Sequence, residues 1–139
     1  IRGIPMLYYG TETALQGGAE PDNRRDMNWG ANPDIRTYVQ KLLTIRKRSA
    51  ALRRGRQLEM WQDDAIFAYL RQTSDAEAIV ALNNDWRRQE REVPLRAECR
   101  LRDGEQLIDQ LTGERVTVQN RRVQVKLEGK QARIFLPAR

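Results

Sequence analysis

The sequence predicts a mixed fold, in which a strand–loop–helix unit is followed by an all-β antiparallel sandwich. Three observations predict it. The apolar run IPMLYY (residues 4–9) ends at Gly10, apolar residues recur at helical spacing in residues 33–52, and short alternating segments separated by turn sequences fill the second half of the chain. We therefore expect two parts, residues 1–54 and residues 55–139.

The first segment, residues 4–9, is apolar throughout and shows no alternation. Such a run is typical of a strand covered on both faces, as in the parallel sheet of an α/β domain. Burial of a large apolar side chain stabilises a fold by about 1.5–3 kcal/mol, yet nothing else in residues 1–54 is suited to pair with this strand. We infer that residues 1–54 are one piece of a larger α/β domain.

A long loop, residues 10–32, follows the predicted strand. Its residues are mainly small, polar or charged. Connections without secondary structure that exceed roughly 12–15 residues are usually functional or disordered. This loop is therefore the first place in the chain to look for a functional site.

A helix is predicted for residues 33–52. Asn32 is suited to be its N-cap and Pro33 to occupy its first position. The apolar stripe that follows has the spacing of one helix face: Ile35, Tyr38, Leu42 and Ile45. Gly55 is a suitable stop just beyond the last turn.

Beyond Gly55 the apolar pattern changes to a period of two. Alternation is clearest in residues 122–127, where Val123, Val125 and Leu127 face opposite to the polar residues between them. Five segments have the composition of short strands: IFAYLRQT (66–73), AIVALNN (78–84), RVTV (115–118), RVQVKL (122–127) and ARIFLP (132–137). Turn-like sequences such as NNDW and LEGK flank them, so this part predicts an antiparallel sandwich.

Composition limits the chemistry of the chain. It has no histidine and a single cysteine, Cys99, which excludes a histidine-based triad, a histidine metal site, an internal disulfide and a multi-cysteine zinc site. No apolar run approaches the ~20 residues of a membrane-spanning helix. The net charge of +6 would suit a nucleic-acid-binding domain. Acidic residues are interleaved through most of the chain, however, so we expect neither a nucleic acid nor a membrane as partner.

Two blocks around the loop resemble a known family. GIPMLYYGTE and, after a gap, PDNRRDMNW are similar to the end of the catalytic barrel in the α-amylase superfamily of glycoside hydrolases, above all to its neopullulanase and cyclomaltodextrinase branch. IRKRSAALRRG, LIDQLTGE and RIFLP resemble the segments that follow in this family. The resemblance implies that residues 4–9 are the eighth strand of a (β/α)8 barrel and residues 33–52 its eighth helix. Residues 55–139 would be the family's C-terminal Greek-key sandwich.

The resemblance also implies roles for the loop of residues 10–32. Such barrels bind substrate on the loops that follow their strands, so this would be an active-site loop. The implied substrate contacts are Arg24, Glu20, Tyr9 and Trp29, and the implied loop-structuring residues are Gly10, Glu12, Pro21 and Asp22. Glu20 stands where the family usually has aspartate, and Thr11 replaces a frequent aspartate. Two alternatives stay open: Arg24 and Glu20 form an ion pair that pins the loop, or Trp29 only packs at the barrel rim.

The catalytic carboxylates of the family are expected outside this chain. Retaining hydrolysis needs two carboxyl groups about 5–5.5 Å apart, and no acidic residue of the loop matches a catalytic motif of the family. We therefore expect no catalytic residue, no metal ligand and no cofactor here, and no hydrolysis by the 139-residue chain alone. A calcium site that uses Asp22, Asn23 and Asp26 in the parent enzyme is a further alternative.

The function implied by the resemblance is that of a C-terminal segment of a retaining glycoside hydrolase acting on α-glucans such as starch, maltooligosaccharides or cyclodextrins. Its expected partners are an α-glucan or oligosaccharide in the intact enzyme, and the remainder of the catalytic barrel or a second copy paired through residues 4–9. Two alternatives remain. One is a non-catalytic β module that binds carbohydrate through Trp61 or Trp86, and the other is a basic nucleic-acid-binding domain centred on residues 46–56.

Overall fold

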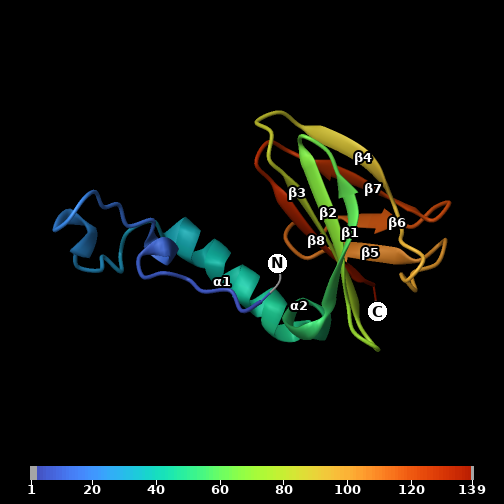
Figure 1. The fold of residues 1–139 in the computed structure, drawn as a ribbon, viewed down its shortest axis with the longest axis horizontal. Coiled ribbons are helices and arrows are strands. Elements are labelled where there is room, and N and C mark those ends of the chain that lie inside the picture. The colour runs from blue at the N-terminus through green and yellow to red at the C-terminus, as the bar shows by residue number, and fades with distance from the viewer. Residues whose placement is uncertain (1–2, 139) are drawn as a thin grey trace. The chain divides into compact units, whose positions relative to one another are not determined.

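A computed structural model describes residues 3–138 of the protein (Figure 1). The backbone divides into two compact units, one that ends at Arg46 and one that begins at Lys47, and each is described by itself. The domain boundary that the sequence predicts after residue 54 stays a prediction, because backbone compactness alone does not define an independently folding unit.

The first unit lacks the strand predicted at its beginning. It contains two short 3-10 helices, η1 (Thr11–Thr13) and η2 (Asp22–Arg24), and most of the helix α1 (Pro33–Arg48). Residues 4–9 pair with no strand among the described residues, so the strand that the sequence predicts for them within a barrel stays a prediction. Ladder hydrogen bonds to a neighbour hold a strand in place, and the described residues supply no such neighbour. The apolar side chains of the run are exposed, Ile4 to 96%.

The predicted helix of residues 33–52 is present but is divided at Ser49. α1 ends at Arg48, and α2 (Ala50–Arg54) begins after Ser49, whose backbone is extended (φ −105°, ψ 115°). The Ser49 hydroxyl accepts a hydrogen bond from the Leu52 N–H at 3.3 Å, which caps α2. Asn32, the predicted cap of α1, has φ 46° and donates from Nδ2 to the Thr13 carbonyl at 2.7 Å. Its amide therefore ties the loop to the start of the helix.

Gly55 ends α2 because two stretches of backbone meet there. Its N–H donates to the Ala51 carbonyl at 2.9 Å, and its φ of −63° is open to any residue. A Cβ at this position would lie 2.4 Å from the Ala51 oxygen and 2.8 Å from the Gln72 nitrogen, closer than real Cβ atoms come. Close approach, and not a left-handed backbone, requires glycine here.

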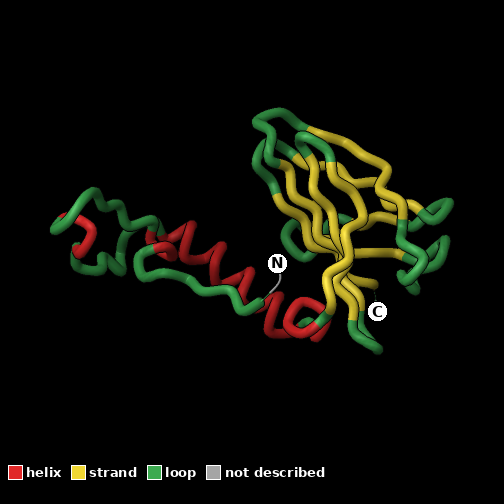
Figure 2. The backbone as a smooth tube through the Cα atoms, in the orientation of Figure 1, coloured by secondary structure: helices red, strands yellow, loops and turns green. Residues whose placement is uncertain are grey.

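The second unit is an antiparallel β-sandwich, as the sequence predicts (Figure 2). Six strands form one sheet in the order β1-β2-β3-β8-β5-β6, and β4 pairs with β7 in the other. β8 returns to lie beside β5 after β6 and β7, which is the connection of a Greek key. The strands are β1 (Arg56–Gln62), β2 (Ile66–Gln72), β3 (Glu77–Asn83), β4 (Gln89–Pro94), β5 (Gln106–Asp109), β6 (Arg115–Thr117), β7 (Arg122–Leu127) and β8 (Ala132–Pro137).

The core of the second unit lies between its two sheets. The alternation predicted in β7 is confirmed, since Val123, Val125 and Leu127 are fully buried and pack in one cluster with residues such as Leu70 and Phe135. The prediction misses β1, β4 and β5. β1 and β4 carry many charged and amide side chains, and β5 has only four residues, so none shows a sustained apolar pattern.

Candidate functional site

The loop of residues 10–32 is organised at its start around Gly10. The φ of Gly10 is 88°, a conformation that side chains disfavour, and its carbonyl accepts hydrogen bonds from the N–H groups of Thr13 (3.1 Å) and Leu15 (2.8 Å). A Cβ on Gly10 would lie 2.6 Å from Leu15 Cβ. The buried Thr13 hydroxyl lies 3.3 Å from the Gly10 carbonyl oxygen and 3.8 Å from the Met27 sulfur. A tight turn therefore directs the chain from residues 4–9 into the loop.

Asp22 holds the middle of the loop. Its carboxylate accepts hydrogen bonds from Arg25 Nε at 2.6 Å and from the Gly18 N–H at 2.7 Å. The bond from Arg25 and then the bond from Gly18 lower the pKa of Asp22, because both stabilise its charged form. Nearby, the Tyr9 hydroxyl donates to the Asn23 carbonyl at 2.8 Å. These bonds connect the beginning of the loop to η2.

Arg24 and Glu20 form an ion pair on the surface of the loop, with side chains 74% and 61% exposed. Exposed ion pairs contribute only about 0–1 kcal/mol to stability. The pair leaves most of both side chains open to solvent, so a ligand could reach them. Trp29 is also exposed, and its carbonyl accepts a hydrogen bond from Arg36 Nη1 at 2.8 Å.

The predicted site residues are only partly brought together. A hollow of about 260 Å³ in the loop is lined by Tyr9, Gly10 and Asp22, together with neighbours such as Asn23 and Arg25, but not by Arg24, Glu20 or Trp29. Glu12 lies in η1, and its Oε2 is buried without a hydrogen-bond partner. Pro21 precedes η2, after a cis peptide bond. Their roles in binding or in loop structure stay predictions.

Large apolar side chains lie exposed on the first unit. Single exposed apolar residues are ordinary, but an extensive set indicates a surface that another structure covers. The set comprises Ile4, Met6, Leu7, Tyr8, Tyr9, Trp29, Ile35, Tyr38 and Leu43. It includes the run IPMLYY, from which the sequence predicts a missing partner, and part of the apolar stripe of α1.

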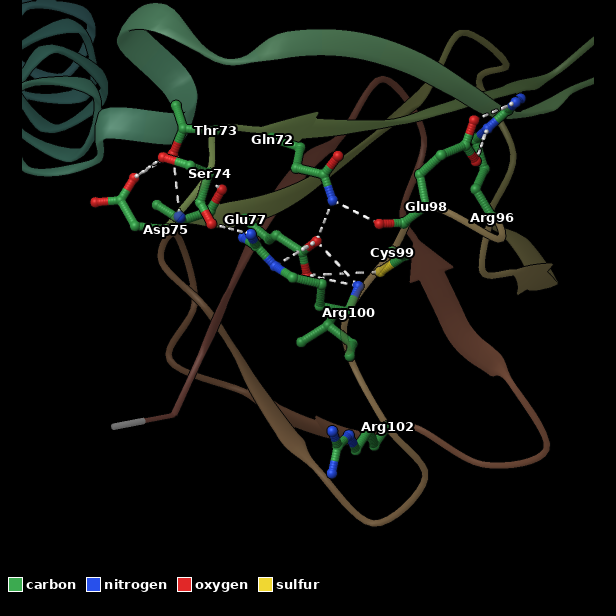
Figure 3. A network of polar contacts seen from close by, with 12 residues as sticks. Gln72, Thr73, Ser74, Asp75, Glu77, Arg96, Glu98, Cys99, Arg100 and Arg102 are labelled. Atoms are coloured by element: carbon green, nitrogen blue, oxygen red, sulfur yellow. Dashed lines mark hydrogen bonds and ion pairs between the residues drawn. The ribbon is translucent and has the colours of Figure 1, made fainter.

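A buried carboxylate, which the sequence analysis does not identify, lies at the centre of a polar cluster in the second unit (Figure 3). Glu77, at the start of β3, accepts hydrogen bonds from Gln72 Nε2 at 2.5 Å and from the Arg100 N–H at 3.0 Å, and Arg100 Nε lies 3.4 Å from its Oε1. Gln72 Nε2 also donates to the Glu98 carbonyl at 2.6 Å. Because donors surround this carboxylate, the cluster joins β2, β3 and the segment before β5 rather than offering an open catalytic acid.

Cys99 belongs to the same cluster. Its sulfur lies 3.8 Å from Glu77 Oε2. Burial, with the negative charge of Glu77 as a further cause, raises the pKa of the Cys99 thiol to about 11. A thiol with this pKa is protonated at neutral pH and is a poor nucleophile.

A hollow of about 850 Å³ opens beside this cluster. Its lining mixes both signs of charge and includes Arg48, Asp75, Glu77, Arg100 and Glu105. Among residues 3–138, no group of three or more His, Cys, Asp or Glu side chains is placed to hold a metal ion. Over the same residues, no helix is long and apolar enough to cross a membrane.

The comparisons with known proteins agree with one another. In sequence, the chain is 38% identical to a β/α-amylase of Paenibacillus polymyxa over 134 residues, which are 96% of this chain and 11% of that relative. It is 35% identical to a cyclomaltodextrin glucanotransferase of Niallia circulans over 85 residues, which are 60% of this chain and 12% of the relative. In structure, it is similar to an α-amylase of Geobacillus thermoleovorans solved with acarbose, with a TM-score of 0.88 and 30% identity over 99% of this chain and 30% of that one.

The chain belongs to the α-amylase family of glycoside hydrolases. No family model matches it, so the assignment rests on the relatives, which match nearly the whole chain. This α-amylase-family chain spans about a tenth of the length of its curated relatives. It fits a C-terminal part of such an enzyme, and its β-sandwich fits that position.

Proposed function

We propose that this α-amylase-family chain is the C-terminal segment of a retaining hydrolase or transferase that acts on α-glucans. In the parent enzyme, residues 4–9 are the last strand of the catalytic barrel and α1 begins its last helix. The loop of residues 10–32 forms part of the substrate cleft, and the sandwich stabilises the barrel. The exposed apolar set of the first unit carries this proposal, because neighbouring barrel strands and helices would cover it.

The proposed contacts to glucan come from Arg24, Glu20, Tyr9 and Trp29. Arg24 presents guanidinium donors that suit sugar hydroxyls, and its exposed ion pair with Glu20 leaves it accessible. Tyr9 lies beside the turn at Gly10, where the chain enters the loop. The relatives support the substrate class: they include amylases and glucanotransferases, and one was solved with acarbose.

Catalysis in the parent requires carboxylates from outside this chain. Two carboxylates of the loop lie in structural contacts: Asp22 accepts from Arg25 and Gly18, and Glu20 pairs with Arg24. The role proposed for this chain is therefore positioning of the glucan, with bond cleavage supplied by the rest of the barrel.

The proposal is tested on the natural protein that contains this chain and on residues 1–139 alone. Reducing-sugar release from soluble starch should be measurable with the natural protein and undetectable with residues 1–139. In the natural protein, Arg24→Ala should raise the KM for maltoheptaose several-fold with a smaller change in kcat, because a uniform binding contact is lost. Arg102→Ala, an exposed arginine of the sandwich, is the matched control and should leave both constants unchanged. Starch hydrolysis by residues 1–139, or a natural protein inactive on every α-glucan, would refute the proposal.

A further inference from the structure

One aromatic side chain of the sandwich is exposed without any packing role. Trp86, in the turn between β3 and β4, is 83% exposed and lies outside the hydrophobic core cluster. Burial normally stabilises a large aromatic side chain within a fold, so a ring left in water does little for folding. The question is whether the surrounding turn presents this ring to a ligand.

The turn that carries Trp86 is locked to a second turn, between β7 and β8. The Lys130 N–H donates to the Asp85 carbonyl at 2.9 Å, and the buried Asn83 donates from Nδ2 to the carbonyls of Arg87 and Glu128, both at 2.9 Å. Both turns lie at the end of the sheets away from α2 (Figure 1). The backbone beneath the ring is thus fixed by bonds on both sides.

Gly129 shows how closely the two turns approach each other. A Cβ at Gly129 would lie 2.0 Å from the Trp86 carbonyl oxygen and 2.6 Å from its carbonyl carbon. Any other residue would push the turns apart. The contact places the Trp86 backbone directly against the β7–β8 turn, which restricts the movement of the backbone that carries the ring.

A cation holds one side of the indole. Lys130 Nζ lies 4.7 Å from a Trp86 ring centroid, within the range of a cation–π contact. The same ammonium donates to the Asn84 carbonyl at 2.5 Å and to Asn84 Oδ1 at 3.2 Å. Lys130 thereby fixes the orientation of the ring, while the high exposure of Trp86 leaves most of its surface open.

Further polar groups lie on the same two turns. Arg88, two residues after Trp86, forms an exposed ion pair at 3.7 Å with Glu128 of the β7–β8 turn. Asn84 borders a shallow hollow of about 450 Å³, which Asp64 of the β1–β2 turn also lines. A flat apolar platform with hydrogen-bonding groups at its edges is complementary to a pyranose ring, whose C–H face is apolar and whose hydroxyl groups project from its rim.

We propose that Trp86 and the two turns around it form a carbohydrate-binding site for the pyranose rings of an α-glucan chain, separate from the loop of residues 10–32. A sugar ring stacks its C–H face on the negative face of the indole, and its hydroxyls bond to groups such as Asn84 and Lys130. The choice of an α-glucan rests on the proposed function, whereas the platform rests on the geometry alone. Because the ring is already oriented, little conformational entropy is lost on binding.

The test is a titration of residues 1–139 with maltoheptaose, followed through the Trp86 indole N–H signal in NMR spectra. One stacked sugar gives a weak complex, so the titration runs to about 10 mM. The Trp86 signal should shift and saturate. In the variants, which lack that indole, binding is followed through the backbone amide signals of Asn84 and Lys130: Trp86→Ala should weaken binding at least tenfold and Trp86→Phe less, because phenylalanine retains a stacking face.

Tyr38→Ala is the matched control, since Tyr38 is an exposed aromatic residue with no proposed contact to glucan. It should leave binding at Trp86 unchanged. Trp86→Ala should keep the wild-type urea midpoint, which shows that lost binding is not lost folding. A Trp86 signal that stays fixed up to the highest concentration, or equal affinity of Trp86→Ala and wild type, would overturn the site. Failure of starch hydrolysis by the natural protein would instead overturn the proposed function, so the two results are distinguishable.

Discussion

Replacement of Asp109 should reveal how strongly one buried carboxylate holds the second unit together. Asp109, the last residue of β5, is fully buried. Its Oδ1 accepts from the N–H groups of Leu111 (3.1 Å) and Ile134 (3.0 Å), and its Oδ2 accepts from the Thr112 hydroxyl at 2.7 Å. One side chain therefore closes the LTGE turn and joins β5 to β8.

The charge of Asp109 also balances a buried cation. Arg133 Nε lies 3.8 Å from Asp109 Oδ2, too far for a hydrogen bond. Its attraction to the carboxylate is therefore electrostatic. Arg133 forms a second ion pair with Glu114, which is largely exposed. Loss of Asp109 would leave the Arg133 guanidinium buried with only this outer partner.

The expected magnitudes follow from these contacts. Asp109→Ala removes several charge-assisted hydrogen bonds and one partner of a buried ion pair, and losses of that kind cost about 3–5 kcal/mol. Asp109→Asn keeps an oxygen for Leu111 and Ile134 but loses the charge and the Oδ2 acceptor of Thr112, so we expect about half that cost. For a domain of this size each kcal/mol corresponds to roughly 4–8 °C in Tm.

The assay is urea unfolding of residues 1–139, followed by circular dichroism of the sandwich. Asp64→Ala is the control, since Asp64 is an exposed turn residue, and surface changes usually stay within about 0.5 kcal/mol. An Asp109→Ala variant within that margin of wild type would refute the reasoning. So would an Asp109→Asn variant less stable than Asp109→Ala, because the hydrogen bonds would then not carry the effect.

Three further predictions concern other contacts. Gly55→Ala should lower the free energy of unfolding by about 2 kcal/mol or more, as measured by urea unfolding, because its Cβ would meet the Ala51 carbonyl. Burial opposes ionisation of Asp63, but hydrogen bonds led by that from the Ile66 N–H outweigh it and hold the pKa of Asp63 well below its ordinary value of 3.8. The stability it provides is therefore present above about pH 4 and is lost as the pH falls below that value, and thermal unfolding of Asp63→Asn should depend less on pH in this range. Leu7→Asp should reduce self-association of residues 1–139 in light scattering, because it places a charge on the exposed apolar run.

Each of these predictions has a matched control. Gly30→Ala should be nearly neutral, since its Cβ would lie 3.6 Å from the nearest atom. Gln62→Ala, a change at an exposed residue next to Asp63 that does not titrate, should leave the pH dependence of unfolding unchanged. Arg102→Asp reverses a charge on the sandwich and should not alter association. The first prediction would be contradicted if Gly55→Ala unfolded at the same urea concentration as wild type. The second would be contradicted if the thermal stability of Asp63→Asn fell with decreasing pH as steeply as that of wild type, and the third if Leu7→Asp and wild type associated equally.

The sequence predicts best where periodicity is strong. β7 shows this, because Val123, Val125 and Leu127 alternate with polar residues and are all buried. β1 and β4 escape prediction because their side chains are largely polar and half-exposed, so that pairing with β2 and β7 decides their structure. The division of the predicted helix at Ser49 depends on one hydroxyl–amide contact, which competes with helix continuation and leaves no mark in the apolar stripe.

The candidate sites show the same limit. Residues 8–29 stand out by composition and family resemblance, and the Arg24–Glu20 ion pair is one of the alternatives that the sequence offers, yet the sequence does not show that Asp22 binds Arg25 and Gly18. The sequence does not identify Glu77, because a single glutamate between a turn and a strand is expected to be exposed to solvent. Its burial depends on Gln72 and Arg100, which only the fold brings to it.

The absence of a strand at residues 4–9 has a physical reason that also distinguishes the two units. An apolar run has no structure of its own in water, because its backbone groups need a neighbouring strand and its side chains need cover. The second unit meets both needs within itself, since every strand from β1 to β8 has a partner and the apolar cluster lies between the sheets. The first unit meets neither: its run is unpaired and its apolar side chains are exposed. The second unit is therefore complete as a sandwich, whereas the first unit has the apolar residues of a barrel strand and helix without the neighbours that would cover them. The proposed role in a larger enzyme follows from this difference.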